Sequence, residues 1–205
     1  MLVFYGVDVG QAGDPAAEVA LAPAGERPGG GPRPVWQLVG ASRVPSGPYG
    51  ALADHVARRR ASLASQAGRS VTTAVDATGC GRPVVEMIRD RVGETTADAA
   101  VLGVTFTGAS RVGGVWPDVT VPKRVMVEHV QVAVESGGLV IDPARPGAAD
   151  LIAEMRAFTD SGGKLGAATG HDDLVCALML ALWLGDTIAE QIHRREGLAH
   201  ERPLR

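Results

Sequence analysis

The sequence predicts one α/β domain built on a mixed sheet of five strands, the first three antiparallel, flanked by helices and followed by a small C-terminal addition. Three strand-like segments follow one another within residues 2–44, as in an antiparallel meander. Beyond residue 49, strand-like and helical segments alternate, which is typical of parallel strands joined by crossover helices. The chain contains no internal repeat and no linker. We therefore expect a single domain over residues 1–205, with a frayed tail from about residue 197.

Hydrophobic patterning and breaker residues give the order of the elements. The expected strands are residues 2–9, 18–23, 35–44, 71–75, 99–107 and 139–141. The expected helices are residues 49–66, 83–91, 122–136, 148–158 and 171–196. Residues 24–34 are rich in Gly and Pro, so we expect a hairpin tip there that supports neither a helix nor a ladder. A hairpin-like turn is expected at residues 161–163.

Composition excludes several classes of protein. The 205 residues are 45% hydrophobic and 21% charged, which is too apolar for a disordered chain. The formal net charge of −3 excludes a protein that coats nucleic acid through its global charge, so any basic DNA surface must be local. The two cysteines lack zinc-ligand spacing and predict reduced thiols in the cytosol. The N-terminus lacks the basic region of a signal peptide, and residues 174–184, the longest apolar run, are shorter than the roughly 20 residues of a membrane span. We expect neither secretion nor a membrane partner.

Acidic residues stand at three places where an apolar element begins or ends. Asp8 and Asp76 close two short apolar strands, and the pair Asp172 and Asp173 opens the final helix. Sheets of α/β proteins place ligand sites at the carboxyl ends of their strands. Each acid also has a structural interpretation, as a turn residue for Asp8 and as a helix cap for the others. Because no structural need places an acid at all three positions, together they predict a carboxylate cluster.

A cluster of three or four carboxylates repels itself unless a cation neutralises it. Hard divalent ions that prefer oxygen ligands, Mg²⁺ or Mn²⁺, suit such a cluster. Two such ions about 3.5–4 Å apart can activate a water and stabilise the leaving oxygen of a phosphodiester. Successive helical residues diverge by about 100°, so Asp172 and Asp173 cannot point alike. Because the small residues Cys176 and Ala177 lie on the same helical face as Asp173, we expect Asp173 to face the sheet. Asp172 then either caps the helix or reaches a second, looser metal.

Motifs for other chemistries are missing. The sequence has no complete dinucleotide fingerprint, no Walker A loop, no GxSxG and no HExxH. Residues 58–60, all arginine, predict a solvated helix face. The candidate DNA contacts are Arg111 in a loop, and Lys123 and Arg124 at the helix start that follows it.

Four segments carry a resemblance to a known family. They are YGVDVG at residues 5–10, VDATGCG at residues 75–81, VPKR at residues 121–124 with the following helix and GGLVI, and GHDDLVCAL at residues 170–178. In this order the chain resembles the C-terminal nuclease domain of tailed-phage large terminase subunits, which has the RNase H/RuvC-like fold. The resemblance covers about residues 2–190.

The resemblance implies a function and a set of site residues. Asp8, Asp76 and Asp173 would be the catalytic acids that hold two divalent ions, with Asp172 beside them and His171 near the second metal. Family members cut double-stranded concatemeric DNA during genome packaging in the cytoplasm of the bacterial host. They work with a packaging ATPase domain, a small terminase subunit and the portal. The sequence departs from the family in two ways: the ATPase domain is not present here, and Cys176 stands where some relatives have a further acid.

Three alternatives remain open at this stage. The first is a Holliday-junction resolvase of the same RuvC-like fold, which four-way junction cleavage would distinguish. The second is an actin-like ATP-binding module, although that architecture needs two duplicated halves and 205 residues are few for it. The third is a non-catalytic RNase H-like interaction module, against which the complete set of acids argues.

Overall fold

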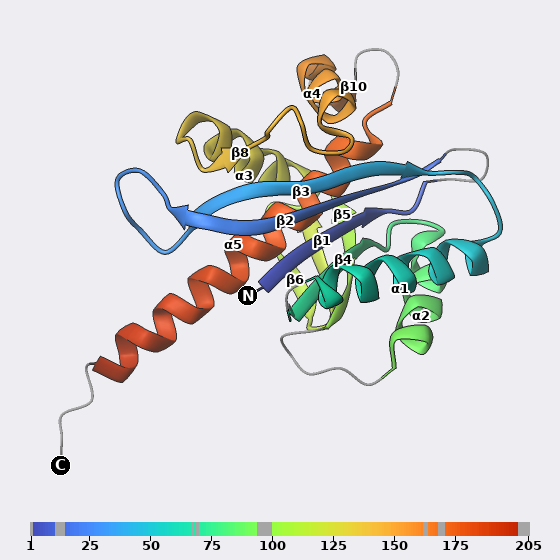
Figure 1. The fold of residues 1–205 in the computed structure, drawn as a ribbon, viewed down its shortest axis with the longest axis horizontal. Helices are drawn as coiled ribbons and strands as arrows, with labels where there is room; N and C mark the ends of the chain where they lie inside the picture. Colours follow the sequence, from blue (N-terminus) through green and yellow to red (C-terminus); the bar gives the residue numbers. More distant parts are fainter. Residues whose placement is uncertain are drawn as a thin grey trace.

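The computed structural model describes residues 2–10, 15–66, 68, 70–93, 100–161, 164–167 and 171–200. Its centre is an eight-stranded mixed sheet with the strand order β6-β7-β5-β4-β1-β2-β3-β8 (Figure 1). The strands are β1 (Leu2–Asp8), β2 (Ala16–Glu26), β3 (Pro34–Val44), β4 (Ser70–Asp76), β5 (Val101–Thr107), β6 (Gly113–Val115), β7 (Asp118–Pro122) and β8 (Leu139–Val140). The helices are α1 (Tyr49–Ser65), α2 (Gly81–Val92), α3 (Lys123–Glu135), α4 (Ala148–Ala157) and α5 (Asp173–His200). A separate hairpin joins β9 (Phe158–Ser161) to β10 (Lys164–Ala167).

The mixed α/β fold is confirmed, and the five predicted principal strands form the middle of the sheet. β1, β2 and β3 are an antiparallel meander, and β4 and β5 continue parallel to β1. The sheet is wider than the five strands expected, because β8 pairs with β3 at one edge and β7 and β6 extend the other edge. β6 was missed because Gly-Gly-Val carries no strand pattern, and β7 was missed because its alternation, with Val119 and Val121 between polar residues, extends over only five residues.

The prediction for residues 24–34 was partly wrong. β2 continues through Pro23 to Glu26, and Gly25 pairs with Val35 in the ladder with β3. A register shift between Pro23 and Gly25 explains this, because a bulge lets a strand carry a proline that cannot donate to the ladder. The turn expected at residues 161–163 falls largely outside the described residues, although the strands β9 and β10 on either side of it pair. The tail predicted to fray from about residue 197 also lies largely outside them, and α5 itself ends at His200.

Each face of the sheet has its own hydrophobic core. Val3, Tyr5 and Val7 of β1 point to the face that α1 and α2 cover. Phe4 points to the opposite face, where α5 lies against β1, β2 and β4 and packs with α3 and α4. Strict alternation along β1 therefore places the last residue of the strand, Asp8, on the α5 face.

A glycine in β1 allows α5 to lie directly against the sheet. A Cβ added to Gly6 would stand 2.7 Å from the backbone N of Ala181, and it would overlap the carbonyl O of Ala177. Any side chain at this position would push the helix away. The close approach brings the first turn of α5 to the end of the sheet where β1 and β4 finish.

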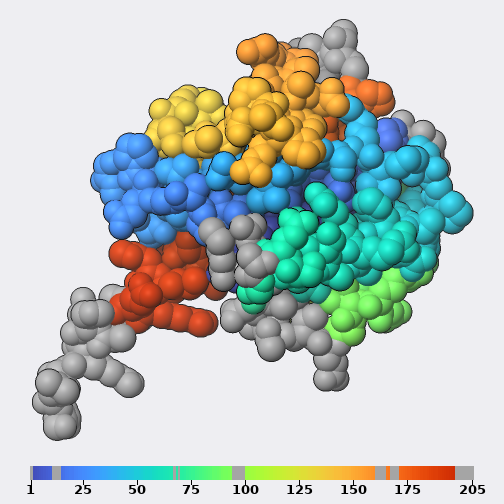
Figure 2. Space-filling view, viewed as in Figure 1, coloured from blue at the N-terminus to red at the C-terminus, as the bar shows by residue number. Residues whose placement is uncertain are grey.

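α5 is the central helix of the fold. Within residues 173–196, a window of 18 residues has a mean hydropathy of 1.4, so the helix is long and apolar enough to cross a membrane by length and composition alone, but 67% of that window is buried inside the protein. Residues 174–184 are buried without exception, which explains why the helix is apolar all round there. The last turns of α5, red in Figure 2, project from the body of the molecule beside the hairpin between β2 and β3.

Candidate active site

Two of the predicted acids lie side by side at the carboxyl edge of the sheet. Asp8 ends β1 and Asp76 ends β4, and these parallel strands are in register, with Val7 opposite Val75. Each carboxylate also has the turn role that the sequence allowed. The backbone N–H of Gly10 donates to Asp8 Oδ1 at 3.4 Å, and that of Thr78 donates to Asp76 Oδ1 at 2.7 Å. The turn bonds fix the carboxylates at the strand ends and leave their second oxygens for other partners.

The first turn of α5 brings the other two acids to the same edge. Burial, the negative charge of Asp76 and those of Asp173 and Asp172 raise the pKa of Asp8 to about 7, against the lowering effect of the Gly10 N–H. Burial also raises the pKa of Asp76, although its hydrogen bonds to Thr78 and the charge of Lys123 oppose the shift. Burial contributes most to the raised pKa of Asp8, and the charges of the other three acids add to it.

Lys123 lies inside this cluster. Its Nζ is 3.3 Å from Asp172 Oδ2 and 5.8 Å from the centre of the Phe158 ring. The sequence analysis had offered Lys123 as a DNA contact together with Arg111 and Arg124. The structure places only the latter two on the exposed surface, while Lys123 offsets part of the negative charge of the acids.

His171 and Cys176 stand at the margins of the cluster. The Nδ1 of His171 is 3.4 Å from Asp173 Oδ2, and the side chain is 55% exposed. Burial, together with the charge of Asp8, raises the pKa of the Cys176 thiol well above its usual value, so this residue stays neutral at pH 7. A neutral thiol adds no negative charge to the cluster.

The oxygen-rich donor set fits a hard divalent cation. Asp8, Asp76, Asp172 and Asp173 supply only carboxylate oxygens, the ligands that Mg²⁺ and Mn²⁺ prefer. A cation at this edge would also offset the negative charges that add to the effect of burial on the pKa of Asp8. Among the residues that the structure describes, no three His, Cys, Asp or Glu side chains are already gathered closely enough to hold a metal ion. The carboxylates thus share one edge without closing around a common point.

A sequence model described as the terminase RNaseH-like domain matches residues 38–184, more than two thirds of the chain. The chain belongs to the terminase RNaseH-like domain family. The match begins after β1, so the equivalence of Asp8 rests on the fold and not on this alignment. The resemblance proposed from the four sequence segments is confirmed at the level of the family.

Solved structures similar to this terminase domain come from a herpesvirus and a bacteriophage. The Mn-soaked human cytomegalovirus terminase nuclease domain is 15% identical with a TM-score of 0.58, covering 92% of this chain and 85% of that one. A second structure of the human cytomegalovirus terminase nuclease domain is also 15% identical, with a TM-score of 0.57 and the same coverage of both chains. The g2p (large terminase) nuclease domain of bacteriophage SPP1 with bound Mn is 17% identical with a TM-score of 0.54, covering 90% of this chain and 86% of that one. No curated protein sequence matches the chain. At these identities the matches show that the terminase domain has the RNase H-like nuclease fold.

One residue of the site in this terminase domain was missed by the sequence analysis. Glu154 of α4 is 7% exposed, and its Oε2 accepts the backbone N–H groups of Leu174 at 2.9 Å and Val175 at 3.3 Å. The sequence had offered Asp172 as the N-terminal cap of α5, but the Asp172 side chain pairs with Lys123 instead. The available signal was an acid on the apolar stripe of a short helix, three residues after Leu151.

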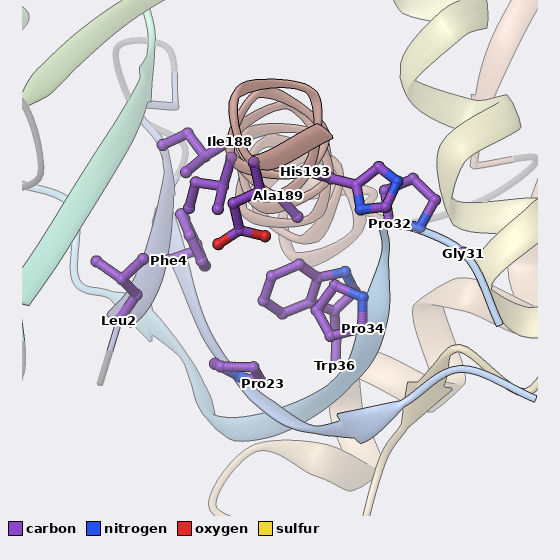
Figure 3. A pocket seen from close by; sticks show the side chains of 12 residues that line it. Leu2, Phe4, Pro23, Gly31, Pro32, Pro34, Trp36, Ile188, Ala189 and His193 are labelled. Carbon is purple, nitrogen blue, oxygen red and sulfur yellow. The ribbon is translucent and has the colours of Figure 1, made fainter. Parts of the chain in front are cut away.

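The apolar hollow shown in Figure 3 is separate from the acid cluster. It measures about 330 Å³ and lies along the second half of α5, where Ile188 and Ala189 face Phe4 and Leu2 across from Trp36. None of the clustered aspartates lines it. The hollow is therefore separate from the edge of the sheet where the four acids lie.

Proposed function

We propose that the chain is a metal-dependent endonuclease that cleaves double-stranded DNA with two divalent ions, Mg²⁺ or Mn²⁺, as in phage genome packaging. The observation that carries the proposal is the meeting of Asp8, Asp76, Asp172 and Asp173 at one sheet edge, with the pKa of Asp8 raised to about 7 by burial and its acidic neighbours. Family membership supports a nuclease, and of the two similar terminase nuclease domains one was soaked with Mn and the other has bound Mn.

The chain's own groups divide the work in this proposal. Asp8, Asp76 and Asp173 are the catalytic acids that hold the metal, and Asp172 helps to hold the second ion. When bound, divalent ions supply an activated water and a stabilised leaving oxygen. Lys123 reduces the repulsion among the carboxylates while the DNA phosphate approaches. His171, at the exposed rim beside Asp173, is in place to accept or deliver a proton.

The DNA partner must be held by local positive charge, because the net charge of the chain is −3. Arg111 and Arg124 are exposed, in the loop between β5 and β6 and at the start of α3. Both elements lead to the edge of the sheet where Lys123 lies. We further propose that the chain works with a packaging ATPase domain, a small terminase subunit and the portal in the cytoplasm of a bacterial host cell.

Plasmid digestion tests the function directly. We expect nicking and linearisation of supercoiled plasmid in Mn²⁺ or Mg²⁺ and no cleavage in EDTA. Asp8→Asn and Asp76→Asn should each abolish cleavage while the thermal melt shows a folded protein. The exposed acid Asp90 of α2 gives a matched control, since Asp90→Asn makes the same charge change away from the cluster. Full activity in either site variant would refute the assignment, and preferential cleavage of four-way junctions would favour the resolvase.

A further inference from the structure

The first turn of α5 is held by a carboxylate from another helix. The first amides of a helix have no partner within it and need an acceptor from outside. Here the acceptor is Glu154 Oε2, twenty residues earlier in the chain, which takes the N–H groups of Leu174 and Val175. The other oxygen of Glu154 pairs with Arg43 of β3. The buried carboxylate thus connects the sheet to the start of α5.

Because Glu154 caps the start of α5, the side chain of Asp172 is not needed as a cap. The side chain of Asp172 is next to the helix start and is of the type that caps best. Its carboxylate instead lies 3.3 Å from Lys123 Nζ, and only its backbone carbonyl serves the helix, by accepting the N–H of Cys176 at 2.8 Å. Because Glu154 satisfies the amides, Asp172 can take part in the acid cluster.

The support for Glu154 is itself rigid. α4 begins beside β3, where the N–H of Ala41 donates to the carbonyl of Pro146 at 2.9 Å. Gly147, with φ 72°, leaves no room for a side chain, since a Cβ there would overlap the Ala41 backbone. A helix fixed in this way to the sheet can hold the first turn of α5 in one place.

We propose that Glu154 is a positioning residue of the nuclease site: by accepting two amides of α5 it sets where Asp172 and Asp173 lie relative to Asp8 and Asp76. The inference rests on the proposed function, because the positioned acids are the proposed metal ligands. Glu154 holds the two amides through the hydrogen bonds that it accepts, whereas its negative charge serves the ion pair with Arg43. Glutamine keeps an acceptor oxygen and loses the charge, so Glu154→Gln and Glu154→Ala separate the two effects.

The experiment measures three quantities on Glu154→Ala, Glu154→Gln and the wild-type chain. The first is NMR-detected hydrogen exchange at the amides of Leu174 and Val175, the second is Mn²⁺ affinity by calorimetry, and the third is kcat and KM for plasmid cleavage. Glu190→Gln is the matched control, because Glu190 also pairs with an arginine, Arg33, but on the opposite half of α5.

In Glu154→Ala we expect exchange at the two amides to rise about tenfold, in line with the loss of a helix cap. We expect Mn²⁺ affinity and kcat to fall by a similar factor, with KM for DNA unchanged. Glu154→Gln loses the ion pair with Arg43 but keeps an acceptor for the two amides, so we expect a smaller change than in Glu154→Ala in all three readouts, and Glu190→Gln should match wild type.

Two outcomes would overturn the proposal. One is Glu154→Ala with wild-type amide exchange and Mn²⁺ affinity. The other is an equal loss in Glu154→Gln and Glu154→Ala, because the charge and not the acceptor would then be responsible. Amide exchange remains informative if the wild-type chain cleaves no DNA, so failure of the nuclease assignment and failure of the positioning role are distinguishable. It also reports on Glu154→Gln if Glu154→Ala does not fold.

Discussion

Gly6→Ala should damage the site without touching any acid. The new Cβ would stand 2.7 Å from the backbone N of Ala181 and closer still to the carbonyl O of Ala177, where ordinary contact begins at 3.4 Å. Both obstacles are backbone, so α5 must move off the sheet by about 1 Å, and a displacement of this size at a reacting group costs about 10²-fold in rate. Overpacking of this kind costs about 1–3 kcal/mol, which for a chain of this length lowers Tm by about 3–10 °C.

Gly185→Ala is the matched control for that prediction. A Cβ at Gly185, also in α5, would stand 2.9 Å from the Trp36 ring, so this variant should lose stability as well. Twelve residues separate it from Asp173, about 18 Å along the helix, so the acid cluster should not move. The assays are thermal melting and Mn²⁺-dependent plasmid cleavage well below Tm. The reasoning fails if Gly6→Ala cleaves at the wild-type rate, or if Gly185→Ala loses as much activity at equal stability. The close approach of α5 to β1 would then not determine where the acids lie.

Three further predictions address the acids and the DNA surface. The pKa of Asp8 is raised from 3.8 to about 7, so the stability that the neutral group gives below pH 4 is lost as pH rises toward 7. In EDTA, Asp8→Asn should raise Tm at pH 8 by about 10 °C, with the gain gone at pH 4. Asp173→Asn should abolish cleavage at all Mn²⁺ concentrations, whereas Asp172→Asn should recover partly as Mn²⁺ is raised; a metal titration giving the reverse would exchange the two roles. Charge reversal of Arg111 and Arg124 together should weaken DNA binding and flatten its salt dependence, measured by anisotropy, and unchanged binding would place the DNA elsewhere.

The sequence predicted the site best where a local pattern allows only one arrangement of the neighbouring strands. Asp8 and Asp76 each end a short apolar strand, and the meander followed by alternation made those strands neighbours. Parallel neighbours finish at the same edge, so the meeting of the two acids could be predicted. The place of Asp173 followed as well, because an apolar helix of this length has to be buried against the sheet.

The parts that escaped prediction depend on contacts between distant segments. Nothing local to Glu154 shows that it accepts amides twenty residues later, since that contact exists only once α4 has docked on β3. Lys123 was assigned to the surface from its charge, and only the fold places its ammonium beside Asp172. β6 carries Gly113 and Gly114, whose sequence gives no strand signal, and pairing with β7 alone makes it a strand.

Contacts at three points along its length fix the position of α5, and the acids at its start repel one another. In its first third, at Ala177 and Ala181, Gly6 lets the helix backbone contact β1. In its second half, the fully buried Asp186 accepts hydrogen bonds from Trp36 Nε1 at 2.8 Å and contacts His129 Nδ1 at 3.0 Å, tying the helix to β3 and α3. At its start, Glu154 holds the first amides. The charges of Asp172 and Asp173 add to the raised pKa of Asp8, and the same repulsion pushes the helix start away from the sheet, so a helix without an anchor at its start would relieve it by tilting. Three separated anchors prevent the tilt, and the repulsion that remains in the folded chain is then available to favour cation binding over release.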